Sequence, residues 1–230
     1  MAAQVNPGKW YSGIDLAEVL RYAGVRDTAL CGEDVKQSAV RAVNEAGEAA
    51  APKQICRECF CSVVEDTCDI DSMTIISRDL AAHLRGCDRA LLFAATLGSS
   101  VDLLIARYSA VKMSYAVMLQ AAAAALVERY CDEVNAALEA RYAAEGCWLK
   151  PRYSPGYGDF SLTHQQALLD RLNAYKYTGI TVSGGGQMTP MKSVSAVIGV
   201  TRERQPGRTG SCASGKCGHC PNISCAFRRV

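Results

Sequence analysis

The sequence predicts a mixed α+β fold, and three observations support this class. Apolar residues make up 49% of the 230-residue chain and charged residues 21%, a balance that allows a large buried core. The continuous apolar run at residues 90–97 is typical of a buried strand. Residues 101–144 instead have the spacing of apolar side chains that is typical of helices. We therefore expect one mixed domain over residues 1–201.

Two amphipathic helices are predicted at the start of the chain. Apolar side chains recur at helical spacing up to Gly24, and a second stripe runs from Val35 to Val43. Pro52 then ends the helical section, because proline lacks the amide hydrogen that a helix interior needs.

Strands and a short helix are expected next. The composition of residues 53–64 and 73–76 is typical of strands. Ser77 is the expected N-cap of a helix that ends at Gly86. The buried strand at residues 90–97 follows.

The second half of the chain is predicted to be helical and then to return to strands. Helices are expected over residues 101–111 and 113–144, and a shorter one over residues 163–175. We expect paired strands at residues 179–183 and 193–200, joined around a glycine-rich connection.

Charge and hydropathy exclude several classes of protein. A formal net charge of +2 and a pI near 7.9 give no basic field for broad nucleic-acid binding. No apolar run approaches the ~18–20 residues that a membrane span needs. The first residues have neither the charged start nor the apolar stretch of a signal peptide. We therefore expect a cytoplasmic protein with no nucleic-acid and no membrane partner.

The chain contains 12 cysteines, and four of them form a separate module after the main domain. Residues 202–211 are charged and contain proline and glycine, which predicts a linker to a module at residues 212–230. Cys212, Cys217, Cys220 and Cys225 follow a C-x4-C-x2-C-x4-C spacing that can place four thiolates around one metal centre. Zinc and an iron–sulfur cluster both suit such ligands. Two disulfides, or free thiols, are the alternatives.

A second group of cysteines, at positions 56, 59, 61 and 68, is a weaker metal candidate. On a strand, Cys59 and Cys61 share one face while Cys56 points to the other. We therefore favour burial of these thiols as small apolar side chains.

The segment RYSPGYGD (residues 152–159) predicts a loop that can bind a ligand. Arg152 offers a bidentate fork for a carboxylate, and Tyr157 offers a hydroxyl and a ring face against which a sulfonium can lie. The alternative is a structural turn whose arginine caps a helix end. The three histidines are isolated in sequence and favour no nucleophile–base pair.

The R-x-x-x-G-Y block, the long helix that contains Glu128 and the MTPMKSVS segment resemble the activation domain of vitamin B12-dependent methionine synthase. The run LLFAATLGSSVDLLI is similar to stand-alone versions of that domain. The resemblance covers roughly residues 10–201 and leaves the cysteine module outside. It implies a twisted antiparallel sheet flanked by helices and bent into a C-shape.

The resemblance also implies a function. The family binds S-adenosylmethionine, docks on a cobalamin-bearing methionine synthase and supports the reductive remethylation of inactive cob(II)alamin. An electron donor such as flavodoxin or ferredoxin is implied. By position, Arg152 would hold the ligand's carboxylate, Tyr157 would line the pocket and Glu128 would pair with the amino group or otherwise polarise the pocket.

The expected function is thus that of a methyltransferase component serving methionine synthase or a related corrinoid protein. Residues 183–187 depart from the family, because glycines stand where the family has a tyrosine-bearing segment. The alternative is an iron–sulfur electron-delivery protein, or a zinc-knuckle docking protein, for a corrinoid partner without use of S-adenosylmethionine.

Overall fold

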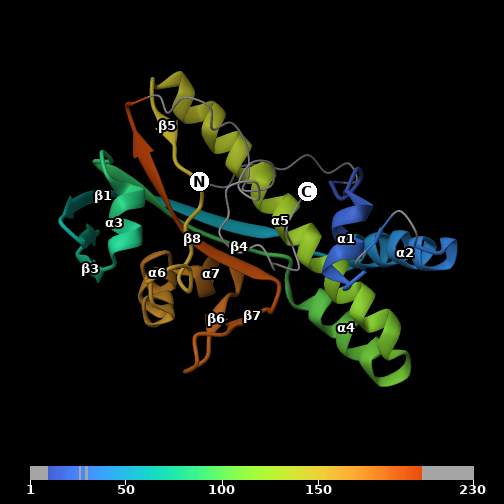
Figure 1. The fold of residues 1–230 in the computed structure, drawn as a ribbon. Coiled ribbons are helices and arrows are strands. Elements are labelled where there is room, and N and C mark those ends of the chain that lie inside the picture. Colours follow the sequence, from blue (N-terminus) through green and yellow to red (C-terminus); the bar gives the residue numbers. More distant parts are fainter. Residues whose placement is uncertain (1–9, 26, 29–30, 204–230) are drawn as a thin grey trace.

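A computed structural model of the protein describes residues 10–25, 27–28 and 31–203. In this part of the chain, six antiparallel strands form a sheet in the order β3-β2-β1-β4-β8-β5, and helices flank it (Figure 1). The mixed α+β class and the antiparallel sheet are therefore as predicted. No helix in the described ranges is long and apolar enough to cross a membrane.

The elements have the following bounds. The strands of the sheet are β1 (Lys53–Val64), β2 (Thr67–Ile70), β3 (Met73–Ile76), β4 (Arg89–Thr96), β5 (Trp148–Leu149) and β8 (Ser193–Thr201). A separate ribbon pairs β6 (Thr181–Val182) with β7 (Met188–Thr189). The helices are α1 (Leu16–Tyr22), α2 (Glu33–Ala49), α3 (Arg78–Leu84), α4 (Ser99–Val111), α5 (Met113–Ala144), the 3-10 turn η1 (Leu162–His164), α6 (Gln165–Arg171) and α7 (Ala174–Thr178).

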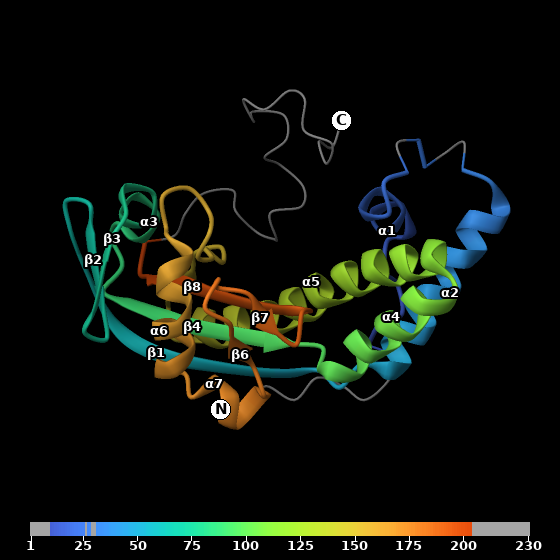
Figure 2. The ribbon, with the colours of Figure 1, turned by 90° about the horizontal axis from the view of Figure 1, so that it is seen from below.

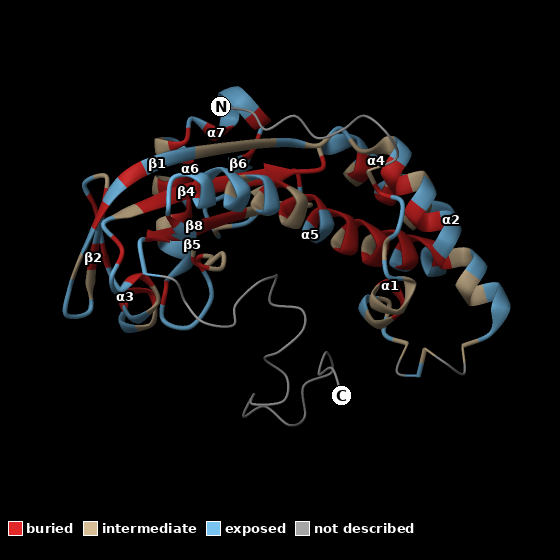
Figure 3. Cartoon of the chain, turned by 90° about the horizontal axis from the view of Figure 1, so that it is seen from above, coloured by how far each residue is buried: buried red, intermediate tan, exposed pale blue. Residues whose placement is uncertain are grey.

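Strand β4 lies between β1 and β8 and is buried on both faces after its first residue. Because side chains alternate along a strand, Leu91 and Phe93 enter one core while Leu92 and Ala94 enter another. The first core is formed with the long helix α5, and the second with α3, α6 and α7. The sheet therefore separates two apolar cores (Figure 3).

Helix α5 extends along the whole domain. Its 32 residues span about 48 Å at 1.5 Å per residue. Helices α1, α2 and α4 pack on it in one half of the molecule, and its C-terminal part crosses the sheet in the other (Figure 2). Buried alanines in its middle permit this close packing, because they add little bulk beyond the backbone.

The predicted pairing of residues 179–183 with residues 193–200 is wrong. Strand β8 pairs with β4 and β5, and the glycine-rich turn instead joins the short strands β6 and β7. The single helix predicted over residues 163–175 is also wrong: Asn173, in the left-handed region with φ of 51°, separates α6 from α7. Strands β2 and β5 were not predicted.

Gly47 gives a test of the packing between α2 and the N-terminal segment. A Cβ atom at this position would lie 2.4 Å from the Tyr11 ring, which is buried. We expect Gly47→Ala to lower the free energy of unfolding by about 1–3 kcal/mol through overpacking, although alanine favours helices. Urea unfolding measures this, with the exposed Glu48→Ala as the matched control. Equal stability of the two variants would contradict the close contact.

Candidate functional site

The predicted ligand loop contacts α5 at its start, through Arg152, and the first turn of α3 at its end, through Asp159. After β5, Tyr153 pairs with Val197 of β8 through two backbone hydrogen bonds of 2.9 and 2.8 Å. Neighbouring residues of an extended segment point to opposite sides. Tyr153 therefore packs against the second core, whereas Arg152 reaches α5.

Arg152 contacts two carboxylates of α5. Its Nη2 donates to Glu128 Oε2 and to Asp132 Oδ1, both at 3.0 Å. The arginine side chain is only 15% exposed, while both carboxylates are more exposed. Glu128 and Asp132 share a helix face because they are four residues apart. We call these three residues the Arg152 triad; with both acids ionised it carries one net negative charge.

Partial burial shifts the titration of the acids in and near the triad. Desolvation raises the pKa of Glu128 above its ordinary value, and Arg152 offsets this only in part. Glu139, farther along the same helix, also has a raised pKa from desolvation, with Asp132 adding to the effect. A cation placed beside this face of α5 would therefore meet carboxylates whose desolvation is only partly offset by Arg152.

Asp132 was not found by sequence reasoning. Its position four residues after Glu128 places it on the same helix face, and this spacing is the signal that could have identified it. The structure brings Arg152 and Glu128 together as direct partners. Arg152 therefore has two acidic partners on α5, whereas the sequence predicted one.

A second set of contacts anchors the loop to the start of α3. The Asp159 carboxylate accepts hydrogen bonds from the Ser77 hydroxyl and from the amides of Arg78 at 2.9 Å and Asp79 at 3.1 Å. The Ser77 hydrogen bond is the main cause of the lowered pKa of Asp159. Gly158 has φ of 54°, in the left-handed region that favours glycine, and a Cβ there would lie 2.3 Å from the Asp79 carboxylate.

Tyr157 lies on the same loop with its side chain 67% exposed. Its carbonyl oxygen accepts from the Phe160 amide at 3.0 Å and from the Tyr153 hydroxyl at 3.4 Å. The structure records no hydrogen bond between Tyr157 and Arg152, both of which it describes. The loop's backbone is thus fixed, while the phenol of Tyr157 remains accessible.

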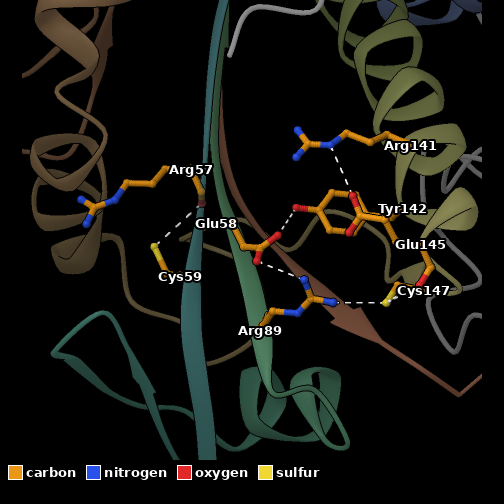
Figure 4. A network of polar contacts seen from close by, with 8 residues as sticks. All are labelled: Arg57, Glu58, Cys59, Arg89, Arg141, Tyr142, Glu145 and Cys147. Carbon is orange, nitrogen blue, oxygen red and sulfur yellow. Dashed lines mark hydrogen bonds and ion pairs between the residues drawn. The ribbon is translucent and has the colours of Figure 1, made fainter.

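A polar network fixes the C-terminal end of α5 to the sheet (Figure 4). The Tyr142 hydroxyl donates to Glu58, and Arg89 donates to Glu58 at 3.1 Å and to the Cys147 sulfur at 3.2 Å. Although desolvation acts in the opposite direction, the hydrogen bonds from Tyr142 and Arg89 lower the pKa of Glu58. This network holds the C-terminal end of α5 against β1 and β4.

The candidate metal ligands Cys212, Cys217, Cys220 and Cys225 lie outside the described residues. All eight cysteines within the described ranges are free, and no cluster of three or more His, Cys, Asp or Glu residues there could hold a metal ion.

The cysteines of β1 alternate as predicted. Cys59 and Cys61 are buried with Cys68 in the second core, and Cys56 packs against the first. Burial raises the pKa of Cys61 to about 12 and that of Cys68 to about 11, as for thiols that serve as apolar side chains.

The fold is similar to that of a solved structure, the crystal structure of the MetH reactivation domain bound to AdoHcy. The TM-score is 0.57 and the sequence identity is 17%, and the match covers 84% of this chain and 77% of that chain. No protein-family model and no curated protein sequence matches the chain. At this identity the likeness shows the fold, which is the activation-domain-like fold that the resemblance implied.

Ser77 gives a test of the loop anchor. Its hydroxyl oxygen accepts from the Leu80 amide at 3.0 Å and its hydroxyl hydrogen bonds Asp159. We expect Ser77→Ala to lower the free energy of unfolding by about 1 kcal/mol through loss of the N-cap. Thermal unfolding monitored by circular dichroism measures this, and the exposed Ser100→Ala serves as control. An unchanged melting temperature in Ser77→Ala would show that the cap is dispensable.

Proposed function

We propose that the Arg152 triad binds S-adenosylmethionine, and that the protein supports the reductive reactivation of a cobalamin-dependent methionine synthase or a related corrinoid methyltransferase. The observation that carries this proposal is the triad itself. A largely buried arginine meets two carboxylates beside an R-x-x-x-G-Y loop. The similar solved domain was bound to AdoHcy, which is S-adenosylmethionine without its transferable methyl group.

The charges of the triad complement those of the ligand. The amino-acid end of S-adenosylmethionine carries a carboxylate, which suits the Arg152 fork, and an ammonium group, which suits Glu128 or Asp132. The sulfonium adds a further positive charge, so the whole ligand is a cation. The net negative triad should therefore favour S-adenosylmethionine over the neutral AdoHcy.

The chain's residues have a positioning role in the proposed reaction. Cobalamin on the partner would supply the nucleophile, and the sulfonium methyl is already electrophilic, so no side chain of this protein has to act as an acid or base. Arg152 orients the amino-acid end, and Asp159 anchors the loop that follows Arg152 to the start of α3. Such positioning is an established source of rate acceleration.

The four-cysteine module enters this proposal as the metal-binding part of the protein. It would bind an iron–sulfur cluster or zinc and, in the former case, pass electrons from a donor such as flavodoxin or ferredoxin. A visible absorption spectrum of anaerobically purified protein distinguishes the two metals. The second candidate function, corrinoid reduction or docking without S-adenosylmethionine, would be favoured by a triad that binds no such ligand.

Removal of the guanidinium tests the ligand site. We expect Arg152→Ala to weaken S-adenosylmethionine binding by about 2 kcal/mol, or roughly 30-fold, from loss of a charged pair. Titration calorimetry measures this. Arg129→Ala is the matched control, because Arg129 also pairs with an acid of α5 but lies outside the triad. Equal affinities in the two variants would remove Arg152 from the site.

Acidification provides a second test. Because the pKa of Glu128 lies above its ordinary value of 4.5, the carboxylate becomes neutral on descent through that higher pKa. Protonation removes a negative charge that faces a cation, so S-adenosylmethionine affinity should fall as pH falls. Glu128→Gln should bind more weakly at pH 7 and show a shallower pH dependence. An identical pH profile in the variant would contradict the role of Glu128.

A further inference from the structure

At one end of the sheet, three large apolar side chains are exposed on a face that no described element covers, with the exposed polar row Ser62, Asp69 and Thr74 between them. Phe60, Val64 and Ile76 are 86%, 69% and 76% exposed. They share one face, because Phe60 and Val64 are four residues apart on β1, Val64 pairs with Thr67, and Thr67 pairs with Ile76. We call these three residues the exposed sheet patch.

The opposite face of the same strands packs against the second core. Cys59, Cys61, Ile70 and Ile75 lie in the second core together with residues of α3. Helix α5 lies on the same side of the sheet as the exposed sheet patch, and its contacts there are with β4, β5 and β8 (Figure 2). Three large apolar side chains exposed together at the edge of a sheet are a candidate contact surface.

The described chain ends close to this patch. Val200 of β8 pairs with Arg89 of β4, and Arg89 pairs with Phe60 of β1. Two strand spacings place Val200 about 10 Å from Phe60. The nine residues from Glu203 to Cys212 span up to about 30 Å, so the segment that carries the four cysteines can reach the patch.

The charges of the two parts are complementary. Residues 58–71 contain five acidic residues and no lysine or arginine, whereas residues 204–230 contain five basic residues and no acid. Glu65, Asp66 and Asp69 are exposed and form no ion pair within the described ranges. The segment also contains Ile223 and Phe227, which could bury apolar area against the patch.

From these observations we propose that residues 204–230 of the same chain dock on the exposed sheet patch. Glu65, Asp66 and Asp69 attract the basic segment, and the apolar side chains of that segment cover Phe60, Val64 and Ile76. The four cysteines are thereby held at the β1–β3 end of the sheet. This docking does not depend on ligand binding at the Arg152 triad.

Zero-length cross-linking of the full chain tests the proposal. A carbodiimide joins an amine only to a carboxylate that it touches. Lys216 is the only lysine of residues 204–230, so a cross-link from the side chain of a lysine in this segment identifies Lys216. We expect mass spectrometry of the monomer to find Lys216 joined to Glu65, Asp66 or Asp69. High salt, which screens exposed charges, should reduce the yield.

The double variant Phe60→Ser/Ile76→Ser should reduce the cross-link about tenfold, because it removes two large apolar contacts. Leu103→Ser is the matched control, since Leu103 is 70% exposed on α4 outside the patch, and it should leave the yield unchanged. Melting curves check that each variant is folded.

Three results would overturn the proposal. Cross-links of Lys216 spread evenly over the acids of the domain would show an undocked segment. Cross-links found only between isotope-labelled and unlabelled chains would assign the patch to a second copy. Absence of any Lys216 cross-link to residues 58–71 in wild-type protein would leave the patch to a separate partner.

Discussion

The burial of β4 on both faces is the constraint on which the rest of the structure depends. A strand with apolar side chains on both sides needs a packed layer on each, so α5 must lie on one side and α3, α6 and α7 on the other. The segment after β5 runs along the sheet beside β8, and its alternate residues face opposite layers. Arg152 meets α5 for that reason, while Tyr153 and Phe160 are held in the second core.

A charged group at such a place is costly unless it is paired. Removing a guanidinium and two carboxylates partly from water is unfavourable, and their mutual attraction compensates only when geometry is good. Two contacts of 3.0 Å to one nitrogen atom meet that requirement without exhausting the donors of Arg152, because a guanidinium has five N–H groups. The arginine can therefore remain stabilised by α5 while it still presents hydrogen-bond donors.

The elements predicted correctly are those whose structure is determined by residues close to one another in the sequence. The helix from Met113 to Ala144 and the strand from Lys53 to Val64 have the predicted bounds, and Ser77 is the predicted cap. The strand pairing of β8 was mispredicted because it is non-local: β8 pairs with β4, about a hundred residues away, rather than with the adjacent segment. The site followed the same rule. Arg152 and Glu128 were named separately, but their contact and the participation of Asp132 depend on how the loop crosses α5.

The unbroken length of α5 has a mechanical consequence. Its first half belongs to the helical part of the molecule and its second half to the sheet, and Glu128 and Asp132 stand near the join. A continuous helix resists bending, so the helical part and the sheet should move as one rigid body, and the segment that bears Arg152 is hydrogen-bonded to β8 within that body. A ligand held between that segment and α5 would therefore keep a fixed orientation relative to both ends of the molecule, so a partner that bound either end would set the direction in which the ligand is presented.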